Sequence, residues 1–275
     1  MKTDEKNKLQ LLHDDLLYMG FGRLTELPQM LEEQVSLDLP SFELYAEAFF
    51  DAESKMEATL YFRKGPSEKY GERYYFNRYE AMLRYLGTPE KDRGQIFYLQ
   101  GGRGFTFKEA FNLLQGRWVC KTVVSNPDKK LLIEDPDDTY TSWFRLDFTA
   151  KTHKGNYYLR YWRGKFDLEG ALEVCQIREL DVPGMMDKLC KLLRKGNLPE
   201  VHFRHKNGKF EKKLITADPE AKMILNYPAA TWAERKRKTP EESVELPGSE
   251  PAESEEISEA VLEDDLARPF KKAHL

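Results

Sequence analysis

The sequence predicts an α+β fold: a twisted, mostly antiparallel sheet of aromatic-rich hairpins with short helices on one face. Apolar residues make up 40% of the 275-residue chain, including 16 Phe, 14 Tyr and 4 Trp, which is enough to fill a core. Apolar and polar residues alternate in many short runs between polar turns, the period of half-buried strands. A strand–turn–strand–helix pattern spans residues 139–174, and residues 105–111 match residues 166–172, each after an aromatic strand. This repetition predicts a possible internal duplication.

Helices are expected in five places. An amphipathic helix over residues 5–19, followed by one over residues 24–34, predicts an N-terminal helical segment, residues 1–37. Two further helices begin after side chains that can cap them: Thr106, with Glu109 completing a capping box, and Asp167. The last predicted helix covers residues 185–194 and ends at a glycine.

The predicted strands fill most of an α+β module over residues 38–230. They are residues 42–48, 56–63, 73–77, 79–85, 95–99, 118–124, 142–148, 157–162, 201–206, 209–215 and 221–227. The first five form a meander, the simplest topology for consecutive strands with polar turns. Asn207-Gly208 between two extended runs predicts a hairpin with a two-residue type I′ turn.

Charge is unevenly distributed along the chain. The formal net charge is −4, but residues 241–275 hold eleven acidic residues against three basic ones, a net charge of −8. Residues 1–240 therefore carry a net charge of +4. Glu, Ser and Pro dominate after a short basic run, so residues 231–275 are expected to be a disordered acidic tail.

Several classes of protein are disfavoured by what the sequence lacks. The N-terminus has no signal-peptide pattern and no run approaches the length of a membrane span, so we expect a cytoplasmic protein with no membrane partner. The three cysteines, Cys120, Cys175 and Cys190, show no CxxC spacing, so neither a disulfide framework nor a zinc site is expected. No nucleophile, base or cofactor signature is present, so we expect no cofactor and no enzymatic activity.

Two local patterns are weak candidates for ligand binding. Gly102, Arg103 and Gly104 precede a helix start and could bind a phosphate, although a flexible turn from strand to helix is the favoured explanation. His202 and His205 are three residues apart, which places their rings on opposite faces of a strand, so no metal site is expected.

The strongest functional pattern is an aromatic and cationic sheet face. Alternation in the central hairpin places five residues on the face opposite the apolar one: Trp143, Arg145, Tyr158, Arg160 and Trp162. Aromatic rings interleaved with guanidinium groups are typical of platforms for single-stranded nucleic acid, but cross-strand pairs on a solvent-facing sheet give the same pattern. With a two-residue turn, the neighbouring hairpin would add a basic patch of Arg204, Lys206, Lys209 and Lys213 suited to phosphates.

Five segments also resemble a known family. They are RYYFNRYEAML (73–83), FTFKEAFNLLQGR (105–117), SWFRLDF (142–148), DLEGAL (167–172) and GNLPEVHF (196–203). In this order they resemble an uncharacterised module that recurs, often in tandem, in accessory proteins of bacterial conjugative and integrative elements. The resemblance covers roughly residues 20–227 and implies a cytoplasmic protein encoded on mobile DNA, with no catalytic residues to carry over. This chain departs from the tandem pattern, since it has one module followed by an acidic tail.

Two functions therefore remain open. The first is a non-enzymatic accessory protein of a mobile element that binds nucleic acid, single-stranded above all, through the aromatic and arginine face. The second is an adaptor that docks a partner protein on the same face, with the acidic tail as a regulatory or recruiting segment, because aromatic residues and Arg are also enriched at protein interfaces.

Overall fold

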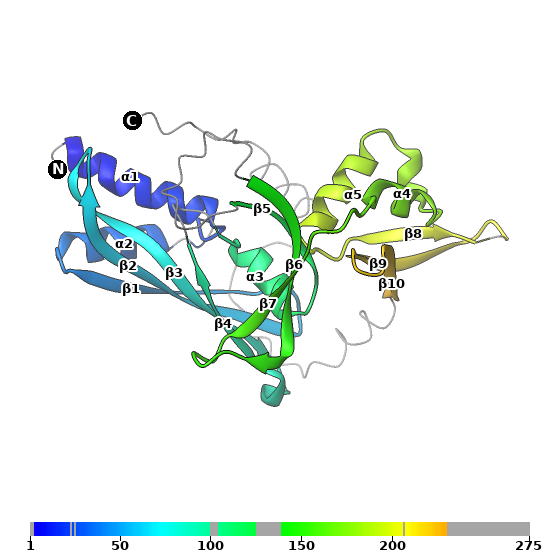
Figure 1. The fold of residues 1–275 in the computed structure, drawn as a ribbon, viewed down its shortest axis with the longest axis horizontal. Coiled ribbons are helices and arrows are strands. Elements are labelled where there is room, and N and C mark those ends of the chain that lie inside the picture. The colour runs from blue at the N-terminus through cyan, green and yellow to red at the C-terminus, as the bar shows by residue number, and fades with distance from the viewer. Residues whose placement is uncertain are drawn as a thin grey trace, which may run out of the picture. The chain divides into compact units, whose positions relative to one another are not determined.

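The structure is a computed structural model, and it describes residues 3–22, 24, 26–99, 104–124, 139–205 and 207–229 (Figure 1). The helices are α1 (Thr3–Tyr18), α2 (Leu27–Ser36), α3 (Phe107–Leu114), α4 (Leu168–Glu173) and α5 (Met185–Arg194), with 3-10 turns at Pro89–Lys91 and Arg178–Asp181. The strands are β1 (Ser41–Ala48), β2 (Ser54–Ser67), β3 (Gly71–Tyr85), β4 (Arg93–Tyr98), β5 (Val119–Val124), β6 (Thr139–Lys151), β7 (Tyr157–Trp162), β8 (Glu200–Arg204), β9 (Phe210–Asp218) and β10 (Met223–Pro228). All paired strands are antiparallel, which confirms the α+β prediction. The predicted acidic tail, residues 231–275, lies outside the described residues.

Within the described ranges the strands form three antiparallel sheets, where the sequence predicted a single one. Their orders are β1-β2-β3-β4, β5-β6-β7 and β10-β9-β8. The strands β1 to β4 form one meander, which is followed by α3. The strands β5 to β7 form a second meander, which is followed by α4. Both helices therefore follow the last strand of a meander, while the internal duplication stays a prediction.

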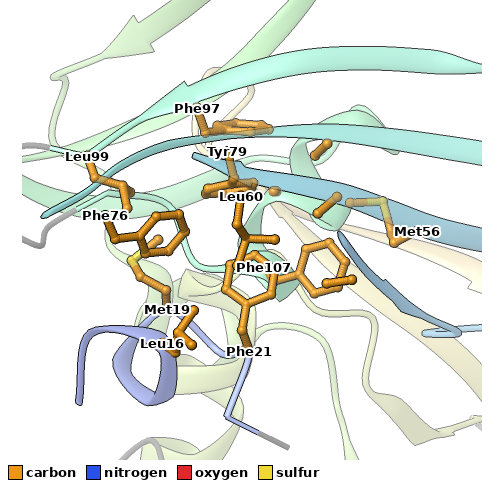
Figure 2. Packing of buried hydrophobic residues seen from close by; sticks show 14 of the residues in the cluster. Leu16, Met19, Phe21, Met56, Leu60, Phe76, Tyr79, Phe97, Leu99 and Phe107 are labelled. Atoms are coloured by element: carbon orange, nitrogen blue, oxygen red, sulfur yellow. The ribbon is translucent and has the colours of Figure 1, made fainter. Parts of the chain in front are cut away.

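The first hydrophobic core lies between the four-stranded sheet and α1, α2 and α3 (Figure 2). Alternate residues of β1 to β4 point into it, and so do Leu12 and Leu16 of α1 and Met19 just after this helix. Phe21, just after α1, stacks on Phe107 of α3 with the ring centroids 4.7 Å apart. The predicted N-terminal helices, α1 and α2, thus pack in the same core as the sheet.

The β5-β6-β7 sheet separates this core from a second one. Val119, Phe144 and Leu146 are buried in the first core, while their neighbours Trp118 and Trp143 are buried in the second. Successive side chains of a strand point to opposite faces, so β6 is buried on both faces at Trp143 and Phe144, whereas most of β7 is exposed. The second core is completed by α4, α5 and the β8-β9-β10 sheet.

Capping side chains fix where α3 and α4 begin. At α3 the backbone N–H of Glu109 donates to the Thr106 hydroxyl (3.3 Å), and the N–H of Thr106 donates to the Glu109 carboxylate (2.8 Å). At α4 the N–H of Gly170 donates to the Asp167 carboxylate over 3.0 Å. These contacts confirm both predicted helix starts, and α5 has the bounds that the sequence predicted.

The β8–β9 hairpin differs from its prediction by one residue of register. His205 pairs with Lys209 through a 2.9 Å backbone hydrogen bond, so three residues rather than two connect the strands. Gly208 has a φ of +78°, whereas Asn207 is not among the described residues with positive φ. A three-residue loop that ends in a left-handed glycine is the G1-bulge connection, so the predicted type I′ turn was wrong. The loop residue Lys206 lies outside the described residues.

None of the helices in the described ranges is long and apolar enough to cross a membrane.

Candidate nucleic-acid interface

The outer face of the β1–β4 sheet carries aromatic and arginine side chains, which the sequence predicted on β6 and β7 instead. Burial in β1 and β2 alternates residue by residue, because one face packs on the first core and the other faces away from it. The outward aromatic and guanidinium side chains are Tyr45, Tyr61, Arg63, Arg73, Tyr75, Arg78, Arg84 and Tyr98. Each of the four strands therefore places at least one ring or guanidinium group on the outer face.

Strand register brings three of these side chains into one row. Tyr61 of β2 is opposite Arg78 of β3, and Arg78 is opposite Tyr98 of the edge strand β4. The Arg78 guanidinium lies 4.3 Å from the centroid of the Tyr61 ring, a stacking distance. Tyr98 is 53% exposed, so its ring is available to a ligand at the sheet edge.

A second ring is held beside this row by the backbone of β2. The hydroxyl of Tyr75 donates to the carbonyl oxygen of Pro66 over 2.7 Å. The ring passes close to Gly65, where an added Cβ would come within 3.3 Å of it. The Arg73 guanidinium lies 4.2 Å from the ring centroid, so Tyr75 is fixed between a glycine and a cation.

We call these residues, with Arg63 opposite Tyr75, the aromatic–arginine patch. Its members are Tyr61, Arg63, Arg73, Tyr75, Arg78 and Tyr98. The patch holds three guanidinium groups and three rings on β2, β3 and β4.

Two carboxylates border the patch. Glu43 is opposite Tyr61, and the Tyr61 hydroxyl donates to Glu80 over 3.4 Å. Burial, followed by the charges of Glu43 and Glu80, raises the pKa of the Tyr61 phenol. Tyr61 is therefore protonated at neutral pH and is a neutral ring with a hydroxyl donor.

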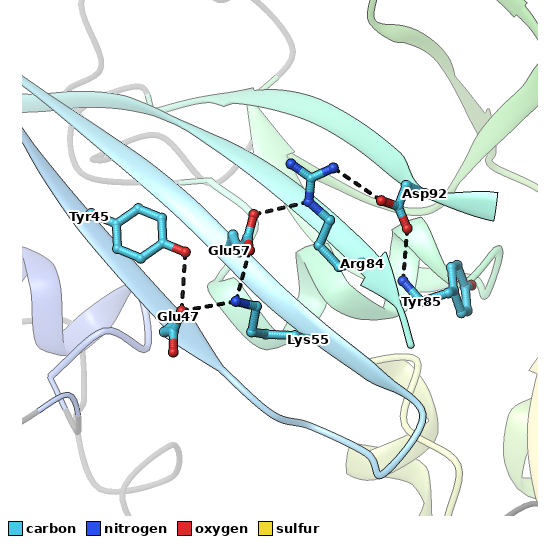
Figure 3. A network of polar contacts seen from close by, with 7 residues as sticks. All are labelled: Tyr45, Glu47, Lys55, Glu57, Arg84, Tyr85 and Asp92. Atoms are coloured by element: carbon cyan, nitrogen blue, oxygen red, sulfur yellow. Dashed lines mark hydrogen bonds and ion pairs between the residues drawn. The ribbon is translucent and has the colours of Figure 1, made fainter. Parts of the chain in front are cut away.

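The opposite end of the same face is a network of paired charges (Figure 3). Lys55 forms ion pairs with Glu47 (3.2 Å) and Glu57 (2.9 Å), and Arg84 forms ion pairs with Glu57 (3.0 Å) and Asp92 (3.1 Å). Because each cation already contacts two carboxylates, this end has little positive charge to offer a phosphate. The cationic part of the face is the aromatic–arginine patch.

The platform predicted on β6 and β7 does not form as expected. Its register is as predicted, with Trp143 opposite Trp162 and Arg145 opposite Arg160. However, Trp143 is 7% exposed, so its proposed role as a solvent-facing stacking residue was wrong. Its ring packs edge-on against Phe166 in the second core, at 5.8 Å between centroids.

Of the other members of that platform, two pack against neighbouring side chains and two are exposed. Trp162 is half-buried and packs against the second core, and Arg145 lies over the Trp118 ring at 4.8 Å. Tyr158 and Arg160 are exposed, and Arg160 lies 3.8 Å from Glu220. Only these two side chains keep the expected exposure, so they do not make a continuous face.

The predicted basic patch on the β8–β9 hairpin is divided by the shifted register. Phe203 is opposite Glu211 and Arg204 is opposite Phe210, so Arg204 lies on one face while Lys209 and Lys213 lie on the other. Carboxylates also neutralise it: Arg204 forms an ion pair with Asp181, and Lys213 one with Glu211 (3.3 Å). The expectation of one compact basic patch was wrong.

The glycine-rich loop is described only at its end. Gly102 and Arg103 lie outside the described residues. At Gly104 an added Cβ would come within 2.4 Å of the Leu99 side chain, so this glycine permits close packing. The first turn of α3 is already capped by Thr106 and by the Glu109 carboxylate, which also pairs with Lys121 at 2.6 Å.

Other reactive groups offer little to a ligand. Burial raises the pKa of the Cys120 thiol to about 11, and burial also raises the pKa of Cys175 and Cys190, so these thiols are protonated at neutral pH. His202 bonds to Glu179 (2.6 Å) and His205 to Glu211 (2.9 Å), as separate pairs. Across the described ranges, no three His, Cys, Asp or Glu side chains gather as a metal site.

The aromatic–arginine patch was not predicted from the sequence, although part of its pattern is present there. The alternation in residues 56–63 places Tyr61 and Arg63 on one face. The decisive information is the register shift between Tyr61 and Phe62, which keeps Tyr75 on the same face as Arg78. A bulge of this kind leaves no distinct local sequence pattern.

Comparisons of the chain with protein-family models, with curated proteins and with solved structures gave no match. The resemblance to a module of conjugative elements therefore stays an expectation from sequence.

Proposed function

We propose that the protein binds single-stranded nucleic acid through the aromatic–arginine patch. The observation that carries this proposal is the row Tyr61–Arg78–Tyr98, in which rings and a guanidinium alternate across three neighbouring strands. Bases of a single strand stack on such rings, and guanidinium groups can both stack on a base and pair with its phosphate. The proposed ligand surface is thus moved from the β6–β7 hairpin to the four-stranded sheet.

The positions of the side chains in the patch suggest different roles for its rings and its guanidinium groups. Tyr98, exposed at the edge strand, would stack on a base. Tyr61 and Tyr75 are covered on one side by Arg78 and Arg73, so these guanidinium groups are held in fixed positions for phosphates. Because stacking uses the π face that every base has, the binding would have little sequence preference.

A partner protein on the same patch is the second candidate. Glu43 and Glu80 at its border would repel phosphates and attract basic side chains of a protein. Tyr and Arg are also the residues most enriched in interface hot spots. A role in a mobile genetic element rests on the family resemblance alone and accompanies either candidate.

The test is fluorescence anisotropy of a labelled oligothymidine with the full-length protein over a salt series. We expect weak binding. The logarithm of the association constant should fall linearly as the logarithm of the salt concentration rises. Arg78→Gln should flatten the slope by about 0.7, the contribution of one phosphate contact on a single strand. Lys154→Gln, in the exposed β6–β7 turn, is the matched control and should leave the slope unchanged. Absence of binding at low salt would reject the nucleic-acid proposal and favour the protein partner.

A further inference from the structure

The strand β7 has one edge at which no other strand of the described part of the chain is paired. It is the last strand of the β5-β6-β7 sheet, so its strand partner is β6 (Figure 1). Two of its side chains, Leu159 and Tyr161, are 40% and 61% exposed. An exposed edge strand with apolar and aromatic side chains is a place where a second extended chain can pair.

A hydrogen bond at the end of β7 shows which backbone groups face this edge. The carbonyl oxygen of Trp162 accepts from the Ser142 hydroxyl of β6 (2.9 Å), so the backbone of Trp162 faces β6. Successive residues of an antiparallel strand alternate in this direction, so the N–H and C=O groups of Leu159 and Tyr161 point away from β6. Within the described ranges, no backbone group pairs with them.

A side chain of β4 already pairs with this edge at its first residue. The N–H of Tyr157 donates to the side-chain oxygen of Gln95 (2.8 Å), and the carbonyl oxygen of Tyr157 accepts from the side-chain nitrogen of Gln95 (3.3 Å). One amide group therefore satisfies both backbone groups of Tyr157, as the backbone of a paired strand would. The next two outward residues, Leu159 and Tyr161, have their backbone groups available to an added strand.

The charge along this edge is mainly positive. Residues 160–165 carry three basic side chains and no acidic one. Arg160 lies 3.8 Å from Glu220, but both side chains are half-exposed, so this ion pair is weak. The guanidinium of Arg163 lies 4.0 Å from the Tyr140 ring and 5.0 Å from the Tyr161 ring. Arg163 forms no ion pair with a described residue, so its N–H groups are open to a carboxylate.

The nearby carboxylate of β6 does not neutralise these cations. Asp147 is opposite Tyr158, and its carboxylate accepts from the N–H (2.9 Å) and the hydroxyl (2.6 Å) of Thr149. The third cation, Lys165, is exposed two residues after Arg163. The edge therefore favours a negatively charged partner.

Strand geometry defines which side chains such a partner needs. In an antiparallel pair, the residues opposite Leu159 and Tyr161 exchange backbone hydrogen bonds with them and lie on the same face of the sheet. Apolar side chains at these positions would pack on the exposed Leu and Tyr. The residue opposite Arg160 lies on the other face, where a carboxylate would pair with the guanidinium.

We propose that the free edge of β7 binds an extended segment of a partner protein as an antiparallel fourth strand, with apolar and acidic residues in alternation. The backbone hydrogen bonds of such an added strand provide affinity, and its alternate side chains provide specificity. Antiparallel pairing is also the arrangement of every strand pair in the described structure. This surface is separate from the aromatic–arginine patch, which lies on the four-stranded sheet.

The test is fluorescence anisotropy of the full-length protein with a fluorescein-labelled peptide of four Val-Glu repeats. We expect saturable binding of this peptide and none of a Val-Lys peptide of the same length. N-methylation of the Val residues should weaken binding about tenfold or more, because their N–H groups are the ones that face β7. N-methylation of the Glu residues, whose N–H groups face solvent, is the matched control and should have little effect. Equal affinities of the two methylated peptides would overturn the proposal.

Substitutions test the same contact from the side of the protein. Leu159→Pro removes an outward N–H and no hydrogen bond to β6, so it should abolish peptide binding, with circular dichroism to verify the fold. The methylated peptides test the proposal in the unmodified protein even where this variant does not fold. Arg163→Gln should weaken binding by up to about fivefold, the usual effect of an exposed ion pair.

Arg78→Gln removes one arginine from the aromatic–arginine patch and is the matched control for Arg163→Gln. It should leave peptide binding unchanged, and a loss equal to that of Arg163→Gln would overturn the assignment to β7. Analytical ultracentrifugation tests a second copy of this chain as the occupant. A dimer that Leu159→Pro dissociates, together with no peptide binding, would assign the edge to self-association and overturn the acidic partner.

Discussion

Trp143 and Phe144 are consecutive in β6, yet their side chains lie in two different hydrophobic cores. The Trp143 ring contacts Phe166 in the second core, and the Phe144 ring lies 5.6 Å from Phe105 in the first. The β5-β6-β7 sheet is thus an internal wall between the two cores. Burial on both sides explains the aromatic pattern of β6 at Trp143 and Phe144, whereas Tyr158 and Tyr161 of β7 are exposed.

Replacing Trp143 by Ala should therefore affect stability. We expect the free energy of unfolding to fall by about 3–5 kcal/mol, the usual cost of a large cavity in a core. Urea denaturation followed by tryptophan fluorescence or circular dichroism measures it. Tyr158→Ala, on the same face of the sheet but 53% exposed, should change stability by less than about 0.5 kcal/mol. Equal losses of stability for the two substitutions would contradict the burial of Trp143 in the second core.

The stability of the protein should depend more on Gly208 than on Asn207, the other residue of the predicted turn in the β8–β9 loop. Gly208→Val should destabilise the protein by about 1 kcal/mol or more, since a β-branched residue is disfavoured at a φ of +78°. Asn207→Val should cost clearly less, because Asn207 does not have a positive φ and loses only its 3.0 Å contact with the N–H of Lys209. Thermal melts of both variants are the measurement, and similar large losses would indicate the type I′ turn after all.

Tyr79 should be intolerant of a small change. Its side chain is fully buried, and its hydroxyl donates to the carbonyl oxygen of Phe105 over 2.5 Å, joining β3 to the start of α3. Tyr79→Phe removes the hydroxyl that donates to this carbonyl and should lower the free energy of unfolding by about 1–3 kcal/mol. Chemical denaturation measures the loss, and a variant as stable as the parent would show that the hydroxyl contributes nothing.

Stability should depend on pH through Lys108. Its folded-state pKa of about 7 lies below the ordinary value of 10.5, so between these pH values the unfolded chain binds more protons. Stability should then rise with pH from about 7 to about 10, with a contribution of up to about 1.4 kcal/mol per pH unit from this one group. Lys108→Met should remove that part of the slope. Denaturation midpoints at several pH values measure this dependence of stability on pH. The same dependence in the Lys108→Met variant would show that Lys108 does not cause it.

Much of the fold could be predicted from sequence because its signals are local. The caps at Thr106 and Asp167 and the alternation in the strands depend on neighbouring residues, and these elements are where they were expected. Register is different, since a shift of one residue moves every side chain to the other face. In the β8–β9 hairpin, such a shift places the basic side chains of the predicted patch on two different faces. Burial is also non-local, and nothing in the sequence near Trp143 indicates that a second core covers it.

The most direct test of the central claim compares two exposed tyrosines for binding to a labelled oligothymidine. Tyr98 lies in the aromatic–arginine patch on β4, whereas Tyr158 lies on the β6–β7 hairpin, and both are 53% exposed. Tyr98→Ala should weaken binding by about 1–3 kcal/mol without changing the salt slope, because it removes a stacked base and no cation, while Tyr158→Ala should have no effect. The reverse pattern, or no loss with Tyr98→Ala, would contradict the assignment of the interface to the four-stranded sheet.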